Sequence, residues 1–298
     1  MKVAIVGLGG IAQKAYLPVF AEMEELEVHL YTRNLEKLKH LQKKYRFKET
    51  HTSIESVIEA GVEAVFVHSS TQSHAEMIKP FIEARIAVYV DKPISDQIEE
   101  TRELTALAER LQVPLMTGFN RRFAPYYQEL KQLENANMIV MQKNRADSMG
   151  EPRTFIYDDF IHVVDTIRFL LDGKVEAFQI FPVFREGLLE SLTVQFSGNE
   201  KVATAIMNRN SGVSEEKVEV LTSTGKYTVS NLQEIEAGTG IVKRLERFPD
   251  WEKTLYKRGF VQIVSAFLEA VKNGQKLPIA EQDALSTHEL CEEILNAL

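Results

Sequence analysis

A glycine-rich stretch near the start of the chain has the spacing of a phosphate-binding loop. Residues 7–12 read Gly-Leu-Gly-Gly-Ile-Ala, which fits the pattern G-x-G-x-x-A. In this pattern the first glycine permits a tight turn, the second lets backbone amides approach a pyrophosphate, and the small last residue allows close packing of a helix. The positive N-terminal end of that helix attracts the anion. The sequence therefore predicts a dinucleotide site, rather than a simple glycine turn, at Gly7, Gly9, Gly10, Ile11 and Ala12.

The residues about 20 positions beyond this loop predict which dinucleotide binds. NAD-binding proteins usually place an acidic side chain there, which accepts hydrogen bonds from the ribose 2′-hydroxyl. This chain has Thr32 and Arg33 instead. Because a guanidinium can pair with a 2′-phosphate and stack on adenine, we predict NADP as the cofactor, with NAD as the less favoured alternative. Arg33 can also be interpreted as an ordinary solvated residue that begins a helix.

Polar residues follow the third apolar run of this region. Residues 69–74 read Ser-Ser-Thr-Gln-Ser-His and come directly after the run Ala64–His68. If that run is a parallel strand, they lie at the carboxyl edge of the sheet, where ligands bind. These residue types are also common at helix starts, so two interpretations stay open, cofactor contacts or helix-start residues, for Ser69, Ser70, Thr71 and His74.

The next apolar run, Ala87–Val90, ends in Asp91, Lys92 and Pro93. The proline keeps Lys92 out of helical angles, in an extended conformation or with a cis bond. A lysine beside an oxidised nicotinamide would lose its proton more readily, because burial and a nearby positive charge both disfavour the ammonium form. Lys92 is therefore a candidate acid–base group, with a surface lysine in a turn as the alternative.

The segment from Asp158 to Leu171 combines an apolar helix with a narrow polar stripe. At about 100° per residue, Asp158, His162 and Asp165 share one side of the helix, and apolar residues cover most of the rest. Buried ionisable groups are costly unless they are paired or used. Asp158 and His162 have the i, i+4 spacing at which a hydrogen bond can fix the imidazole tautomer. The alternatives are a helix cap with a core histidine, or a divalent metal site, which we discount because no second histidine lies at ligand spacing.

The alternation of apolar runs with helical periods predicts the elements that position these residues. Runs that are apolar throughout indicate strands of a sheet covered on both faces, and helical stretches separate them. We therefore predict a doubly wound parallel sheet, a Rossmann domain, over residues 1–119. The expected strands are Val3–Val6, Val28–Thr32, Ala64–His68, Ala87–Val90 and Leu115–Gly118, and the expected helix caps are Asn34, Ser53 and Ser95.

The alternation of apolar runs with helical stretches ends near Phe119 and Asn120, without a flexible linker. Strand-like runs are now joined by turns of hairpin length, which predicts a largely antiparallel sheet. Helical stretches return at Phe160–Leu171, Phe260–Lys272 and Ala280–Ala297. We predict a second α/β domain over residues 120–298 with an open sheet.

Composition limits the class of protein. The 298 residues include 35 Lys and Arg against 43 Asp and Glu, a net charge of −8, which argues against a nucleic-acid partner because that needs a basic face. The single cysteine, Cys291, cannot form an intramolecular disulfide or a cysteine-based zinc cluster. No apolar run approaches the roughly 18–20 residues that span a bilayer, and the start lacks a signal-peptide core. We expect a cytoplasmic protein with no membrane partner.

Taken together, the motifs resemble those of the Gfo/Idh/MocA oxidoreductases, named after glucose–fructose oxidoreductase and inositol dehydrogenase. The matches occur in order along the chain: residues 7–12, the turn 71–74, Asp91-Lys92-Pro93, residues 118–125 with Arg121, and Asp158-x-x-x-His162-x-x-Asp165. The resemblance implies a Rossmann domain, a second domain whose open sheet often forms subunit contacts, a nicotinamide cofactor and sugar- or polyol-like substrates. By position Lys92 corresponds to the catalytic lysine, Asp158 to the substrate-binding carboxylate and His162 to the catalytic histidine, while Asp91 and Arg121 join the cofactor-binding set.

Two departures from the family pattern concern the substrate pocket. The stretch between Pro125 and Asp158 is short, and residues 154–157 replace glycines that often precede the family's aspartate. The leading hypothesis is an NADP-dependent oxidoreductase in which Lys92 and His162 converge over one nicotinamide ring. The alternatives are a non-catalytic NADP-binding regulator and a metal-dependent lyase or hydrolase. We expect a homodimer or homotetramer that forms through the second sheet.

Overall fold

The computed structural model describes residues 1–298 and divides into two compact units. Unit 1 comprises Met1–Gly118 and Phe260–His288, and unit 2 comprises Phe119–Gly259 and Glu289–Leu298. Residues 260–288 were expected in the second domain, whereas the structure groups them with unit 1. The reason is aromatic packing, because the Phe267 ring lies 5.3 Å from that of Phe66 and 5.6 Å from that of Tyr89, both in the first sheet.

Unit 1 is built on a six-stranded parallel sheet in the order β3-β2-β1-β4-β5-β6. The order reverses between β1 and β4, and in such sheets a ligand crevice lies at the carboxyl ends of the strands at this point. All residues of β4 and β5 are buried, as expected of strands that are apolar throughout. The strands are β1 (Lys2–Val6), β2 (Glu27–Tyr31), β3 (Glu49–His51), β4 (Ala64–Val67), β5 (Ala87–Val90) and β6 (Leu115–Thr117).

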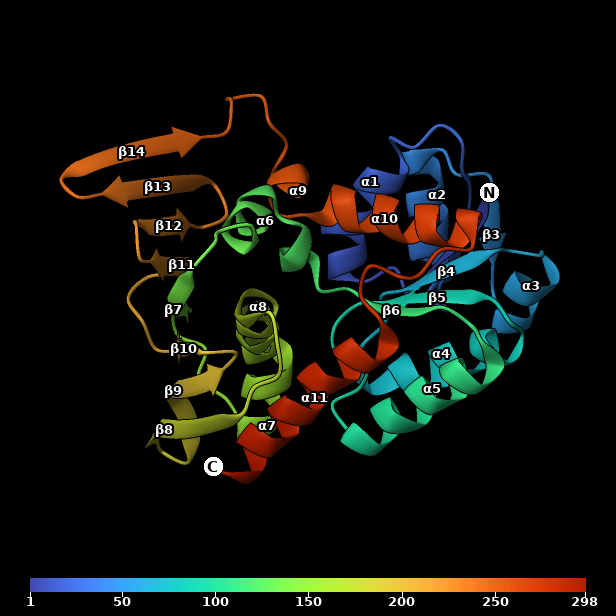
Figure 1. Cartoon of the computed structure of the whole chain (residues 1–298). Helices are drawn as coiled ribbons and strands as arrows, with labels where there is room; N and C mark the ends of the chain where they lie inside the picture. The colour runs from blue at the N-terminus through green and yellow to red at the C-terminus, as the bar shows by residue number, and fades with distance from the viewer. The chain divides into compact units, whose positions relative to one another are not determined.

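Helices cover both faces of this sheet, with α1 and α10 on one face and α4 and α5 on the other (Figure 1). The predicted caps Asn34 and Ser53 are confirmed, since their side chains accept the amides of Lys37 and Ser56. Ser95 is wrong as a cap, because the helix begins at Ile98 after Gln97. The helical segments are η1 (Ala12–Tyr16), α1 (Leu17–Phe20), α2 (Leu35–Tyr45), α3 (Ile54–Glu59), η2 (Thr71–Ser73), α4 (His74–Glu83), α5 (Ile98–Leu111) and α10 (Phe260–Asn273).

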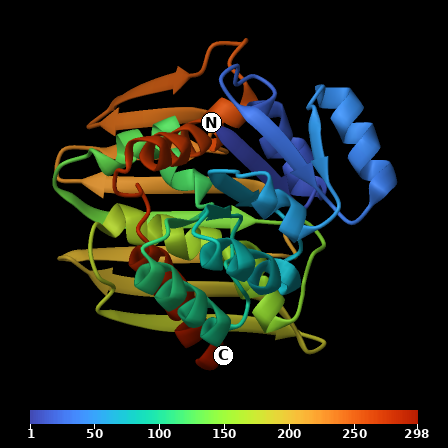
Figure 2. The same cartoon turned by 90° about the vertical axis from the view of Figure 1, so that its right-hand side faces the viewer.

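Unit 2 contains an eight-stranded sheet in the order β14-β13-β12-β11-β7-β10-β9-β8, and its strands stack from one edge to the other in Figure 2. The pair β7–β10 is parallel and the other pairs are antiparallel, so the expected largely antiparallel sheet is confirmed. The strands are β7 (Ala136–Asn144), β8 (Ala177–Arg185), β9 (Leu188–Gly198), β10 (Lys201–Asn208), β11 (Glu215–Thr222), β12 (Lys226–Ser230), β13 (Glu234–Thr239) and β14 (Val242–Arg247).

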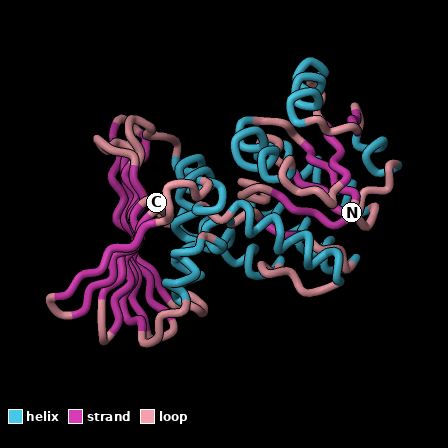
Figure 3. The backbone as a smooth tube through the Cα atoms, turned by 90° about the horizontal axis from the view of Figure 1, so that it is seen from above, coloured by secondary structure: helices cyan, strands magenta, loops and turns pink.

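The helices of unit 2 lie on one side of this sheet, where α8 packs on β7 and β10 and α6 packs on β12 (Figure 3). None of the helices combines the length and the hydrophobicity that a membrane span requires. The helical segments are η3 (Asn120–Phe123), α6 (Pro125–Lys131), α7 (Pro152–Thr154), η4 (Phe155–Phe160), α8 (Ile161–Leu171) and α9 (Thr254–Lys257), while α11 (Glu281–Asn296) contributes residues to both units.

Candidate functional site

A crevice of about 510 Å³ opens in unit 1 at the point where the strand order reverses. Three segments that follow β1, β2 and β4 surround it, as the sheet topology requires. Its lining includes most residues that the sequence predicted for the cofactor: Gly7, Gly9, Gly10, Ile11, Thr32, Arg33, Ser69 and Ser70. The structure therefore brings the predicted phosphate loop and the predicted specificity residues together in one cavity.

The glycine loop has the close backbone approach that its motif requires. Gly7 has φ +85°, and a Cβ added there would lie 2.5 Å from the backbone N of Ser69, so only glycine fits. At Gly9 the nearest atom to an added Cβ is 3.6 Å away, and at Gly10 nothing lies within 4 Å. These two positions thus leave open space above the backbone, which a side chain would fill. Ala12 is fully buried at the start of η1 and packs the helix onto the sheet.

Two cations line the crevice at the end of β2. Arg33 is exposed, and Lys37 lies one turn further along, where its amide is bonded to the Asn34 cap. The Thr32 hydroxyl accepts the Asn34 amide at 3.4 Å, so it helps to form the same turn. Lys37 is not among the residues predicted from the sequence, although its place in the first turn after the Asn34 cap indicates that it lies near Arg33. The rim therefore carries positive charge and no carboxylate at the position where an NAD site usually has one.

The turn after β4 divides the predicted residues into two groups. Ser69 and Ser70 line the crevice, whereas Thr71 and His74 do not. The two ring nitrogens of His74 lie 3.1 Å from the carbonyl oxygen of Ser69 and 2.8 Å from that of Pro93, and burial lowers the pKa of the ring. His74 thus ties the serine turn to the segment that contains Lys92.

Buried polar atoms without hydrogen-bond partners lie beside the phosphate loop. His68 is 1% exposed, its ring stacks on Tyr16 at 3.8 Å, and neither of its nitrogens has a partner. The Ser69 hydroxyl is orphaned in the same way. A buried polar group without a hydrogen-bond partner lowers the stability of a folded protein by about 1–3 kcal/mol. The presence of such groups beside the loop fits a site for a polar ligand. Together with the open space above Gly9 and Gly10, the residues of the crevice fit a dinucleotide.

Asp91 and Lys92 lie at the end of β5, and the peptide bond from Lys92 to Pro93 is cis. The Asp91 carboxylate accepts the Lys92 amide at 3.0 Å and lies 3.5 Å from the Tyr16 hydroxyl, which is bonded to that of Tyr89. Burial raises the pKa of Asp91, against the lowering effect of Lys92 and His74. Asp91 therefore organises the turn that carries Lys92.

The polar stripe of unit 2 departs from the expected regular helix. Asp158 lies in η4, a π-helical segment, and His162 lies in the first turn of α8. Asp158 is exposed and His162 is partly buried. Asp165, which was expected on the same stripe, is buried and accepts the guanidinium of Arg122 at 2.6 Å. Asp165 thus has a structural partner, while the hydrogen bond between Asp158 and His162 stays a prediction.

Arg121, which was predicted to bind the cofactor, has a protein partner within unit 2. Its guanidinium donates two hydrogen bonds to Glu216, at 2.8 and 2.7 Å, and Tyr127 donates a third at 2.9 Å. Burial alone would raise the pKa of Glu216, but the charge and hydrogen bonds of Arg121 lower it to about 2. This pair joins η3 to β11, and the cofactor role of Arg121 stays a prediction.

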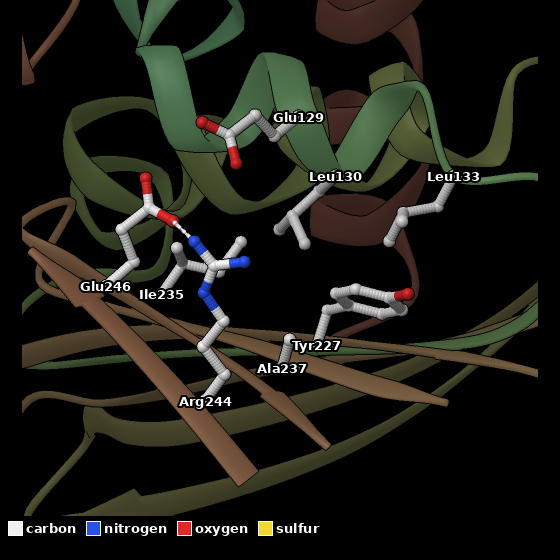
Figure 4. A pocket seen from close by; sticks show the side chains of 8 residues that line it. All are labelled: Glu129, Leu130, Leu133, Tyr227, Ile235, Ala237, Arg244 and Glu246. Atoms are coloured by element: carbon white, nitrogen blue, oxygen red, sulfur yellow. Dashed lines mark hydrogen bonds and ion pairs between the residues drawn. The ribbon is translucent and has the colours of Figure 1, made fainter. Parts of the chain in front are cut away.

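A separate cavity of about 140 Å³ lies in unit 2 between α6 and the outer strands of the sheet (Figure 4). Burial raises the pKa of Glu129 at this cavity, and the nearby Glu246 raises it further. Arg244 pairs with Glu246 at 3.4 Å. Neither Asp158 nor His162 lines this cavity, so it is not part of the predicted site.

Comparison with known proteins identifies the family. A sequence model described as "Oxidoreductase family, NAD-binding Rossmann fold" matches residues 1–119, and one described as "YceM-like, C-terminal domain" matches residues 125–240. YceM of Salmonella typhimurium is 34% identical, in an alignment that covers 100% of this chain and 97% of YceM. The chain belongs to the Gfo/Idh/MocA family.

Solved structures of this family agree with the architecture of the chain. A Gfo/Idh/MocA family oxidoreductase from Vibrio cholerae has a TM-score of 0.94 and 32% identity, and covers 100% of this chain and 97% of its own. The dehydrogenase MviM from Clostridium difficile has a TM-score of 0.94 and 31% identity, with coverage of 100% and 99%. The predicted family, fold class and enzyme class are confirmed. This Gfo/Idh/MocA protein is an oxidoreductase with an NAD-binding Rossmann fold.

Proposed function

We propose that this Gfo/Idh/MocA protein transfers a hydride between NADP and a secondary alcohol or carbonyl group of a sugar- or polyol-like compound. The observation that supports it most is the crevice of unit 1, in which an open glycine loop and two cations face one cavity. A relative supports the proposed substrate class: a protein from Thermotoga maritima, 25% identical over 80% of this chain, is named myo-inositol 2-dehydrogenase.

When bound, the nicotinamide cofactor supplies the redox chemistry, because it carries the hydride. The chain's own task is to hold the cofactor and substrate and to move one proton. The glycine loop and the start of η1 would hold the pyrophosphate through backbone amides. Lys92 or His162 would exchange the substrate's hydroxyl proton, and Asp158 would orient the histidine and accept a hydrogen bond from a substrate hydroxyl.

The preference for NADP is supported by the rim at the end of β2. Arg33 and Lys37 place two cations there, and a 2′-phosphate would neutralise part of that charge. We expect Arg33→Asp to weaken NADP binding by at least about tenfold, which is about 1.4 kcal/mol, and to spare NAD. Titration calorimetry with both dinucleotides tests this, with the exposed Arg46→Asp as a control on the far end of α2. Unchanged affinity for NADP in Arg33→Asp would refute the assignment.

Turnover provides the test of the reaction itself. Purified protein with NADP or NADPH is assayed for changes in nicotinamide absorbance across polyols, sugars and their carbonyl forms. Lys92→Ala should lose turnover and keep the cofactor affinity, while Lys79→Ala, an exposed lysine on α4, should behave as wild type. Binding of the dinucleotide without turnover on any of these compounds would instead favour the non-catalytic regulator.

We also propose that copies of the chain associate through the open face of the sheet in unit 2. The strand register places Met138 and Val202 side by side, and Phe181 and Val183 lie on the same face as these two. All four are between 44% and 54% exposed. A face with several large apolar side chains gains by burial against another surface. Light scattering of wild type and Phe181→Glu tests this, and a monomeric wild type would contradict it. The cytoplasmic location stays a prediction.

A further inference from the structure

Asp159 lies directly after Asp158 in η4, but its side chain has a different environment. It is 15% exposed, and its carboxylate accepts the ammonium of Lys143 at 2.7 Å and the guanidinium of Arg145 at 3.1 Å. Arg209 lies 4.0 Å away on the other carboxylate oxygen. Lys143 lies near the end of β7, Arg145 directly follows that strand, and Arg209 directly follows β10. Through Asp159 the π-helical segment is therefore attached to two neighbouring strands.

This cluster has features that a purely stabilising contact would not need. Lys143 is 3% exposed at its side chain, and replacing a buried ion pair with apolar residues often leaves stability unchanged or improves it. The Nη1 of Arg209 is buried without a hydrogen-bond partner. The carboxylate of Asp159 thus faces three cations, two of them within hydrogen-bond distance. The cluster does hold one short segment of backbone, η4, in a single position.

That segment is the one that carries the predicted substrate carboxylate. η4 is π-helical over Phe155–Phe160, and π-helical turns are rare and occur frequently at functional sites. Asp159 is held inward by its cations, so the neighbouring Asp158 remains exposed. His162 follows within one turn, in α8. A shift of this anchor would move both groups together.

We propose that Lys143 and Asp159 are positioning residues, whose ion pair fixes the π-helical segment so that Asp158 and His162 keep their reactive orientation. This inference rests on the function proposed above. Neither residue contacts the substrate, and both act through the backbone of η4. Loss of either partner leaves the side chains of Asp158 and His162 chemically unchanged but changes their orientation. A displacement of about 1 Å can lower the rate about 100-fold.

The charges that surround Lys143 make the pair sensitive to pH. Burial lowers the pKa of Lys143 to about 7, and Arg121 and Arg145 lower it as well, against the opposing effects of Asp159 and Glu216. The ammonium form, which makes the ion pair, is therefore replaced by the neutral amine as the pH rises through about 7. We expect the backbone of η4 to become more mobile over the same pH range.

The experiment compares Lys143→Met and Asp159→Asn with wild-type protein bound to NADP. Lys131→Met is the matched control, because Lys131 pairs with Asp172 and the Phe169 carbonyl at the other end of α8. Three kinds of measurement are made at fixed NADP affinity, which is checked by calorimetry: amide exchange over residues 155–162, the imidazole titration of His162 by NMR, and steady-state kinetics (kcat and KM) for the best substrate. Asp159→Asn keeps the size of the side chain and lets Lys143 become neutral, so it remains informative if Lys143→Met does not fold.

We expect both variants to speed amide exchange over residues 155–162 by at least about tenfold, to shift the His162 titration, and to lower kcat about 10- to 100-fold. The affinity for NADP should stay within about twofold, and Lys131→Met should match wild type in all three measurements. The kcat profile of the wild type should fall as the pH rises through about 7, and this alkaline limb should be absent from the profile of Lys143→Met.

The result that overturns the proposal is wild-type exchange, titration and kcat in both variants, together with inactivity of His162→Asn. In that case the proposed reaction stands and the positioning role does not. If His162→Asn and Asp158→Asn keep full turnover, the site assignment itself fails, and the inference falls with it. Full activity in Lys143→Arg would support the role of the positive charge.

Discussion

The burial of Lys143 predicts how the stability of the protein changes with pH. Burial lowers its pKa from 10.5 to about 7, so between these values the folded chain has lost a proton that the unfolded chain still binds. Raising the pH then favours the folded state, by about 1.4 kcal/mol per pH unit. The contribution of Lys143 to the free energy of unfolding is therefore largest above the pKa of the unfolded chain. It falls as the pH drops from about 10.5 to about 7, and it does not change further below about pH 7.

The perturbation is Lys143→Met, which keeps an unbranched side chain one heavy atom shorter and removes its titration. Urea unfolding of wild type and variant is followed at several pH values, and the difference between their unfolding free energies is plotted. That difference should rise in favour of wild type by about 3 kcal/mol between about pH 8 and about pH 10. Taking the difference cancels the contributions of the other titrating groups.

Lys131→Met serves as the control, because its ammonium pairs with an aspartate that is 69% exposed. Its curve should run parallel to that of wild type over the same pH range. A flat difference for Lys143→Met would show that this lysine stays protonated in the folded protein. It would then refute the reasoning that burial dominates its charge state, and the alkaline loosening of η4 would have no basis.

Three further predictions concern the two units separately. Gly7→Ala should abolish dinucleotide binding in a calorimetric titration, because the added Cβ would clash with the backbone. In Gly10→Ala the added Cβ contacts nothing, so this variant should fold normally and lose much less affinity. Arg121→Met should cost about 3–5 kcal/mol in a denaturant melt, because it removes the cation from the buried carboxylate of Glu216, and a change within about 0.5 kcal/mol would contradict this. Asn34→Ala should destabilise by about 1 kcal/mol, through loss of the helix cap, with no change in the sheet's circular dichroism.

The sequence predicted the first unit well because its signals are local. Strands that are apolar throughout, glycines at fixed spacing and capping side chains each act within a few residues, and β5 has the predicted bounds Ala87–Val90. The short edge strand β3 was missed because Glu49–His51 has no apolar run. The aromatic contacts of Phe267 connect residues about 200 positions apart in the chain, and no local pattern reports such packing.

The second unit was harder because its signals depend on partners that are far away in sequence. β14 is exposed along its whole length, so hydrophobic alternation cannot reveal it. A regular helix was assumed from Asp158 onward, and its spacing of about 100° per residue assigned Asp165 to the same stripe. The π-helical segment breaks that spacing, and the guanidinium of Arg122 binds Asp165 instead.

One signal for the anchor of η4 was nevertheless present in the sequence. Ile139, Met141 and Lys143 alternate along β7, and the first two are fully buried. Side chains two residues apart point to the same face of a strand, so the lysine must face inward with them. An inward lysine at the end of a core strand requires a buried counter-charge. The doublet Asp158-Asp159 offers two carboxylates, and the structure uses Asp159 as this counter-charge while Asp158 is exposed.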